Sequence, residues 1–113
     1  VFTDGTRLDI DPFMAKNKYV YTIYSESEKS YPKQTICGYT CMEKDYLAHE
    51  IYAKLPEIND YIIFENVGAY TIVFTPPFIK ERPAVIAVDN DQVFVVRKKE
   101  TIRQFFNEEL YSF

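Results

Sequence analysis

Residues 38–45 read Gly38-Tyr39-Thr40-Cys41-Met42-Glu43-Lys44-Asp45, and residues 64–71 read Phe64-Glu65-Asn66-Val67-Gly68-Ala69-Tyr70-Thr71. The first stretch places a thiol close to acidic side chains, and the second places a tyrosine on a glycine-containing turn. Neither arrangement is needed merely to close a β-barrel. The two stretches therefore predict parts of a functional site, carried on a fold that the rest of the chain must supply.

The composition limits what kind of protein this is. The chain has 113 residues, 47% of them hydrophobic, with ten Tyr and nine Phe. This length supports one core of ordinary size, so we expect a single domain over residues 1–113. The net charge of -4 argues against a nucleic-acid partner, because phosphate binding needs Lys and Arg. No apolar run approaches the roughly 20 residues that span a bilayer, so we expect a soluble cytoplasmic protein with no membrane partner.

Cys37 and Cys41 are the two cysteines, and His49 is the one histidine. A four-ligand zinc site cannot be assembled from this set, so we predict no metal. A disulfide between the cysteines would lie along one strand, where the side chains stand too far apart for its geometry. We expect free thiols in a reducing compartment and assign His49 no role.

Short runs of aromatic and β-branched residues predict a mainly β fold. We expect strands over residues 19–24, 34–39, 61–65, 70–75, 84–88 and 92–97. The polar residues 25–30 should form a solvated loop, and Asp89-Asn90-Asp91 should turn the last hairpin. This inventory predicts an antiparallel, Greek-key-like β-barrel with a short C-terminal helix, because closure removes exposed strand edges.

Thr101 and Gln104 have the spacing of a capping box that begins the C-terminal helix. Its apolar stripe, which we expect to pack against the sheet, is Ile102, Phe105, Phe106 and Leu110. A second helical spacing occurs at Leu47, Ile51 and Leu55. Periodicity alone therefore leaves residues 45–58 open to a helix or an extended segment.

An ordered set of motifs resembles the carboxy-terminal domain of the pyridoxal-phosphate-dependent decarboxylases of the ornithine, diaminopimelate and arginine group. The matching pieces are Asp4-Gly5, the Cys41 segment, Leu55-Pro56-Glu57, residues 60–64, Gly68-Ala69-Tyr70, Arg82-Pro83 and residues 96–101. The resemblance implies a β-barrel (sheet) domain in which residues 45–58 are extended. Nothing in the chain resembles the (β/α)8 barrel domain that carries the cofactor lysine in that family.

The resemblance also implies roles for three residues. Cys41 matches the cysteine that reaches across the dimer to the cofactor and influences protonation of the substrate carbon, for which a thiol is suited. Tyr70 matches a tyrosine whose hydroxyl reaches the cofactor phosphate, and Asp45 matches an acid that pairs with a lysine of the other subunit. The alternatives are a small buried hydrophobe for Cys41, an inward barrel aromatic for Tyr70 and a surface aspartate for Asp45.

Departures from the family pattern bear on the substrate. Met42 stands where an acid normally binds the distal amine, and Glu43 follows one position later. Asp11 and Ala15 stand where the diaminopimelate branch has an arginine and a tyrosine that hold a distal carboxylate, so diaminopimelate is disfavoured.

Asp4 aligns with an aspartate that meets the distal amine, and Arg7 could meet a substrate carboxylate. With Asp9 and Asp11 they could equally form a solvated charged loop. We therefore take Asp4, Arg7 and Glu43 as candidate substrate-binding residues.

The resemblance implies a lyase that decarboxylates an amino acid or acylated diamino acid, in polyamine, siderophore or other specialised biosynthesis. It implies a homodimer with shared active sites and pyridoxal 5'-phosphate held mainly by the absent domain, so this chain alone should be inactive. The rival interpretations are an alanine-racemase-like domain and a non-catalytic relative that binds a partner protein.

Overall fold

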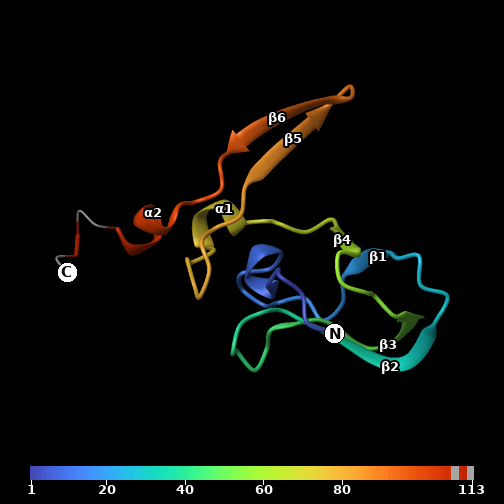
Figure 1. Cartoon of the computed structure of the whole chain (residues 1–113). Helices are drawn as coiled ribbons and strands as arrows, with labels where there is room; N and C mark the ends of the chain where they lie inside the picture. Colours follow the sequence, from blue (N-terminus) through green and yellow to red (C-terminus); the bar gives the residue numbers. More distant parts are fainter. Residues whose placement is uncertain (108–109, 112–113) are drawn as a thin grey trace. The chain divides into compact units, whose positions relative to one another are not determined.

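The computed structural model describes residues 1–107, 110 and 111, which form a mainly β structure with short helices (Figure 1). Its elements are the 3₁₀ turn η1 (Arg7–Asp9), β1 (Val20–Tyr24), β2 (Ser30–Cys37), β3 (Tyr46–Lys54), β4 (Tyr61–Glu65), α1 (Thr71–Phe74), β5 (Val85–Asp89), β6 (Gln92–Arg97) and α2 (Ile102–Phe106). The chain divides into two compact units, Val1–Thr75 and Pro76–Phe113, each described here by itself. No helix of the described residues is long and apolar enough to cross a membrane.

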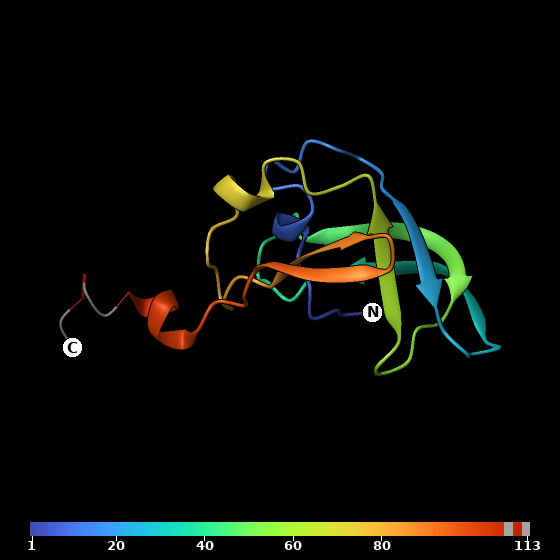
Figure 2. The ribbon, with the colours of Figure 1, turned by 90° about the horizontal axis from the view of Figure 1, so that it is seen from above.

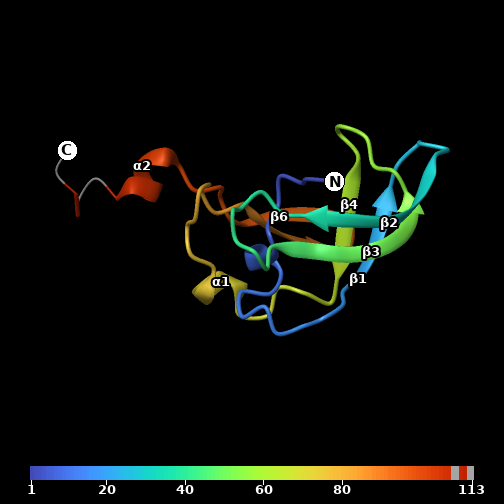
Figure 3. The same ribbon diagram turned by 90° about the horizontal axis from the view of Figure 1, so that it is seen from below.

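Two antiparallel ribbons build the first unit. β1 pairs with β4, and β2 pairs with β3 through a register interrupted by irregularities. Figures 2 and 3 show that the β2–β3 ribbon runs across the β1–β4 ribbon. Along β1 and β4 half-buried and exposed residues alternate, so each strand turns one face toward the rest of the unit.

The buried apolar side chains of this unit lie close to the predicted site segments. Leu8 of η1, Ile36 of β2 and Leu47 of β3 are 7%, 1% and 5% exposed. Leu8 follows Arg7 directly, and Leu47 comes two residues after Asp45. The backbone next to both charged residues is therefore anchored by burial.

In the second unit, β5 and β6 form the predicted hairpin. Asn90 and Asp91 at its tip have φ of 46° and 63°, the left-handed values that a tight two-residue hairpin turn requires. Thr101 begins α2 with the predicted capping box to Gln104. The helix ends at Phe106 because Asn107 turns left-handed (φ 48°), so Leu110 lies beyond it.

The apolar stripe predicted for this helix is largely exposed. Ile102 and Phe106 are 55% and 48% exposed, and Leu110 is 74% exposed. Phe105 is half-buried, so the prediction that the stripe packs against a sheet is wrong for the other three residues. The short length of α2, five residues, explains part of the difference, since it presents little more than one turn of apolar surface.

Residues 70–75 are not the predicted strand. Gly68 (φ 90°) and Tyr70 (φ 67°) both adopt left-handed backbone, which turns the chain into α1. The N–H and the hydroxyl of Thr71 then both donate to the carbonyl of Gly68, at 3.1 and 2.8 Å. The alternation of apolar and polar residues in this segment suits a strand, but the backbone before it cannot continue as one.

The other extended segments agree with expectation, with changed boundaries. Residues 46–54 form β3, so this region is a strand and not a helix. Ser30, expected in a solvated loop, already belongs to β2. The named strands form three two-stranded sheets in the part of the chain that is described, and closure into a barrel stays a prediction.

Candidate functional site

The loop between β2 and β3 winds around the carboxylate of Asp45, which is 3% exposed. Oδ2 of Asp45 accepts hydrogen bonds from the N–H of Thr40 at 3.0 Å and from its hydroxyl at 2.6 Å. The main chain closes the same loop, because the N–H of Gly38 donates to the carbonyl of Asp45 at 2.9 Å and the N–H of Asp45 donates to that of Met42 at 3.0 Å. Residues 38–45 thus form a closed loop, which we call the cysteine loop.

Cys41 and Glu43 lie on the exposed part of the cysteine loop. Cys41 is a free, exposed thiol, whereas Cys37 is a free, half-buried thiol at the end of β2. An exposed thiol on a fixed loop can exchange a proton with a bound molecule, which a thiol packed in a core cannot do. The alternative of a buried hydrophobe does not apply to Cys41.

The other oxygen of Asp45 joins the cysteine loop to the N-terminal part of the chain. Oδ1 accepts the hydroxyl of Thr6 at 3.0 Å and the N–H of Arg7 at 2.7 Å. The Thr6 hydroxyl also accepts the N–H of Leu8, so it caps the start of η1. The segment of residues 6–16, which we call the anchor loop, therefore begins directly on Asp45.

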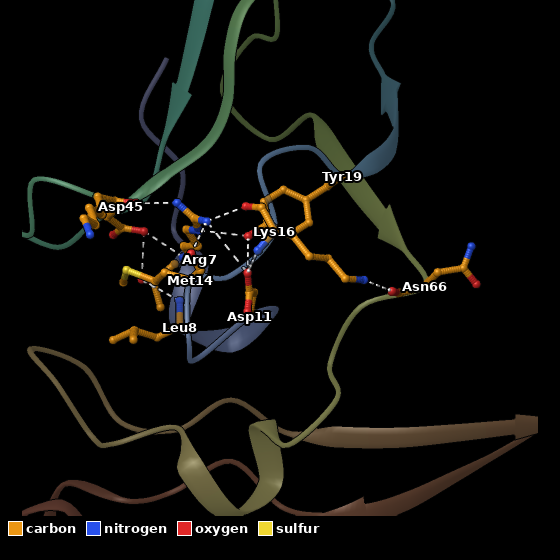
Figure 4. Close-up of polar contacts among 10 residues, drawn as sticks. Arg7, Leu8, Asp11, Met14, Lys16, Tyr19, Asp45 and Asn66 are labelled. Atoms are coloured by element: carbon orange, nitrogen blue, oxygen red, sulfur yellow. Dashed lines mark hydrogen bonds and ion pairs between the residues drawn. The ribbon is translucent and has the colours of Figure 1, made fainter.

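Arg7 is turned into the anchor loop (Figure 4). Its Nε donates to the hydroxyl of Tyr19 at 2.8 Å, and its Nη2 donates to the carbonyls of Met14 and Lys16 at 2.9 and 2.6 Å. Nη1 reaches the carbonyl of Lys44 at 3.2 Å. Four of the five N–H directions of a guanidinium are used, and the side chain is 13% exposed. The predicted contact with a substrate carboxylate would require this set to open.

Asp11 completes the Arg7 cluster. Its Oδ2 lies 3.8 Å from Nη2 of Arg7 and accepts the N–H of Lys16 and the hydroxyl of Tyr19, both at 2.9 Å. Burial raises the pKa of Asp11, but these hydrogen bonds, one from the backbone of Ala15 and the Arg7 charge outweigh it, so the pKa is lowered. Burial and the bond to Asp11 raise the pKa of Tyr19. The cluster is therefore an ionised carboxylate held by a protonated tyrosine and an arginine.

The anchor loop also holds the turn that carries Tyr70. The N–H of Gly68 donates to the carbonyl of Ile10 at 2.9 Å, and Nζ of Lys16 donates to the carbonyl of Asn66 at 2.9 Å (Figure 4). The hydroxyl of Thr75, after α1, donates to the carbonyl of Leu8 at 2.9 Å. The cysteine loop and the Tyr70 turn, far apart in sequence, are thus both tied to residues 6–16.

Tyr70 belongs to a cluster of exposed aromatic rings. Its ring centroid lies 5.6 Å from that of Phe13, edge to face, and 6.1 Å from that of Phe74. Tyr70 is 66% exposed, Phe13 57% and Phe74 53%. Tyr70 is therefore not an inward-facing barrel aromatic, and its hydroxyl is on an accessible ring.

Asp4 is exposed and lines a pocket of about 580 Å³. The pocket is lined by residues 1–6, 9, 10, 47, 56–62 and 64, and neither Cys41 nor Tyr70 is among them. The structure thus brings Cys41, Glu43 and Tyr70 onto segments held by one loop, while Asp4 lines a pocket that includes none of these three residues. Among the described residues no group of three or more His, Cys, Asp or Glu side chains could hold a metal ion.

The sequence did not reveal the connecting role of Thr6, Tyr19 and Asp45. A threonine ahead of a short turn is a recognisable capping signal, and it could have identified Thr6. No local pattern marks Tyr19 or the buried state of Asp45, because Asp11 lies 8 residues from Tyr19 and Thr6 lies 39 residues from Asp45.

The family model "Pyridoxal-dependent decarboxylase, C-terminal sheet domain" matches residues 1–68. No curated protein matches the chain.

Solved structures match nearly the whole chain. Diaminopimelate decarboxylase from M. jannaschii matches with a TM-score of 0.83 at 20% identity, over 99% of this chain and 26% of that one. The enzyme from Helicobacter pylori, complexed with L-lysine, matches with 0.82 at 22% identity, over 97% and 28%. AQ1208 from Aquifex aeolicus matches with 0.75 at 21% identity, over 97% and 28%. At these identities the likeness shows the fold alone, and the chain spans about a quarter of the length of these proteins.

Proposed function

Because the chain belongs to the pyridoxal-dependent decarboxylase family, as the C-terminal sheet domain, we propose that the full-length protein decarboxylates an amino acid or an acylated diamino acid with pyridoxal phosphate. The family match carries this proposal, since residues 1–68 include the whole cysteine loop and reach the start of the Tyr70 turn. The domain that binds most of the cofactor would lie outside these residues, in keeping with the share of the solved relatives that the chain spans.

Cys41 and Tyr70 are the residues that we assign to the reaction. Pyridoxal phosphate supplies the electron sink that makes loss of carbon dioxide possible. The exposed Cys41 thiol would hold the proton that is delivered to the substrate carbon. The Tyr70 hydroxyl, on a ring that is 66% exposed, would donate a hydrogen bond to the cofactor phosphate.

The proposal includes a homodimer whose active sites lie at the interface, because the resemblance implies it and because Cys41 and Tyr70 are both exposed on this domain. It also includes a single sheet domain whose ribbons complete a β-barrel, which would protect the free strand edges. The two free thiols are compatible with a reducing compartment, the cytoplasm.

We propose that the distal end of the substrate is an amine or an acylated amine. Glu43 and Asp4 are exposed acids that could accept a hydrogen bond from it. Arg7, the one predicted contact for a carboxylate, has most of its donors engaged with the anchor loop. Asp11, which stands where the diaminopimelate branch has an arginine, is occupied within the anchor loop and offers no donor to a distal carboxylate, so diaminopimelate stays disfavoured.

Turnover by Cys41→Ala in the full-length protein tests the assignment, with Cys37→Ala as the matched control. Removal of a proton donor at the reacting carbon should lower kcat about 10²- to 10⁴-fold, whereas Cys37→Ala should leave it nearly intact. Equal effects of the two changes, or a loss of folded protein that accounts for the defect of Cys41→Ala, would return Cys41 to a structural role.

A further inference from the structure

We propose that Asp45 is a positioning residue, which fixes the loop that carries Cys41 and joins it to the anchor loop that holds the Tyr70 turn. The inference rests on the proposed function where turnover is concerned. Its structural part, the control of the cysteine loop by one buried carboxylate, stands independently of the reaction.

The hydrogen bonds of Asp45 are saturated. An ionised carboxylate offers about four lone-pair directions, and Asp45 accepts four hydrogen bonds, two on each oxygen. One oxygen faces Thr40 of the cysteine loop, and the other faces Thr6 and Arg7 of the anchor loop. The predicted pairing of Asp45 with a lysine of another subunit stays a prediction, and the four contacts inside this domain carry the present inference.

Gly38 provides a second, independent sign that the carboxylate is held in one place. A β-carbon at Gly38 would overlap both carboxylate oxygens of Asp45. The carboxylate is thus packed directly against the backbone where the cysteine loop leaves β2. Any larger residue at position 38 would have to push Asp45 away from Thr40.

The position of Cys41 follows from these contacts. Thr40, the preceding residue, is bound to Asp45 through both its N–H and its hydroxyl. Met42, the following residue, donates its N–H to the Thr40 hydroxyl at 3.3 Å and accepts the N–H of Asp45. The backbone on both sides of Cys41 is therefore set by Asp45 and by the hydroxyl that it orients.

The link to Tyr70 runs through η1. Thr6, bound to Asp45, caps η1, and Ile10 at its end accepts the N–H of Gly68. Only the three residues of η1 separate Thr6 from Ile10, so a displaced Thr6 would move the acceptor of Gly68. Asp45 therefore stabilises both site segments, although it touches neither Cys41 nor Tyr70 side chains.

Asp45→Asn in the full-length protein tests this role, because the amide keeps one acceptor oxygen and its nitrogen cannot accept the hydrogen bonds of the other side, whether from Thr40 or from Thr6 and Arg7. Asp60→Asn is the matched control, since Asp60 also accepts a backbone N–H, from Glu57 at 2.7 Å, but in the loop between β3 and β4. We expect kcat to fall about 10- to 100-fold in Asp45→Asn, as for a misplaced reacting group, with KM nearly unchanged. Asp60→Asn should retain wild-type kcat.

Two readouts do not depend on turnover. Amide hydrogen exchange of residues 39–44 should accelerate about fivefold in Asp45→Asn, because a loosened cysteine loop opens more often. Amide hydrogen exchange of residues 66–75 should also accelerate in that variant and not in Asp60→Asn.

Thr40→Val and Thr40→Ser keep the test decisive if Asp45→Asn does not fold. The valine removes the hydroxyl at nearly constant shape and should reproduce the faster exchange of residues 39–44, and the serine should keep the wild-type rate. Exchange of residues 39–44 and kcat within about twofold of the control, in a folded Asp45→Asn or Thr40→Val protein, would overturn the proposal. A wild-type protein without decarboxylase activity would refute the proposed function, while hydrogen exchange would still decide the role of Asp45.

Discussion

Replacing Arg7 by Ala should loosen the anchor loop and should not act chiefly through substrate binding. Arg7 donates to Tyr19, Met14, Lys16 and Lys44, and its side chain is 13% exposed. With alanine at position 7, these four acceptors would either accept hydrogen bonds from water or have no donor. The change therefore removes the centre of the cluster that orders residues 6–19.

The magnitude follows from the exposure of each contact. The bonds to Lys16 and Lys44 lie at the exposed edge, where water replaces a lost donor at little cost. The bonds to Tyr19 and Met14 are partly buried, and hydrogen bonds to a charged donor contribute about 1.5 kcal/mol each at the low end of their range. The ion pair with Asp11, at 3.8 Å, adds less than about 1 kcal/mol. The sum is about 3 kcal/mol, which corresponds to a roughly 100-fold larger open population of the loop.

Amide hydrogen exchange in the full-length protein measures this opening. Peptides that cover residues 5–19 should exchange roughly 100-fold faster in Arg7→Ala, and Arg7→Lys should lie between, because one ammonium cannot replace the planar fork. Arg103→Ala, which removes an exposed arginine on α2, is the control. Exchange within about twofold of wild type, together with a loss of kcat/KM for a substrate with a second carboxylate, would refute this reasoning and give Arg7 the substrate role.

Three further experiments test other parts of the account. The isolated chain should bind pyridoxal phosphate weakly or not at all, and a tight stoichiometric absorbance change on titration would contradict an incomplete site. Because the pKa of Asp11 is lowered, its contribution to stability is present above its ordinary pKa of 3.8 and is lost as the pH falls through the lowered value. Asp11→Asn should remove that acid-dependent part of the exchange protection around Lys16, and an unchanged pH profile would argue against it. Gly38→Ala should destabilise the cysteine loop by at least about 2 kcal/mol, because its β-carbon overlaps the Asp45 carboxylate; chemical denaturation that shows no loss would mean that the loop can shift.

Local signals in the sequence sufficed for the elements whose residues specify their own geometry. Asn90 and Asp91 tolerate left-handed backbone, so they mark the last hairpin without reference to the rest of the fold. The side chains of Thr101 and Gln104 each accept a hydrogen bond from the backbone N–H of the other residue, and this pair marks the start of α2. The resemblance supplied what periodicity could not, since it favoured an extended, irregular backbone for residues 45–58 against the helical spacing of Leu47, Ile51 and Leu55. Within this region residues 46–54 form β3.

Long-range contacts decided what the sequence could not predict. Tyr70 adopts a left-handed conformation that is uncommon for a tyrosine, and the bond between Gly68 and Ile10 helps to hold the turn before it. Asp45 became buried because Thr6, 39 residues earlier in the chain, supplies a donor. A pattern of neighbouring residues contains neither contact, so the strand predicted over residues 70–75 was wrong and the intradomain role of Asp45 was missed.

Carbon dioxide release by the full-length protein tests the central claim most directly. The protein, loaded with pyridoxal phosphate, should be supplied in turn with a panel of amino acids and acylated diamino acids. The account predicts cofactor-dependent release from at least one substrate with a distal amine or acylated amine, and none from diaminopimelate. Absence of release from every substrate, with the cofactor bound and the protein folded, would contradict it and favour a non-catalytic member of the family.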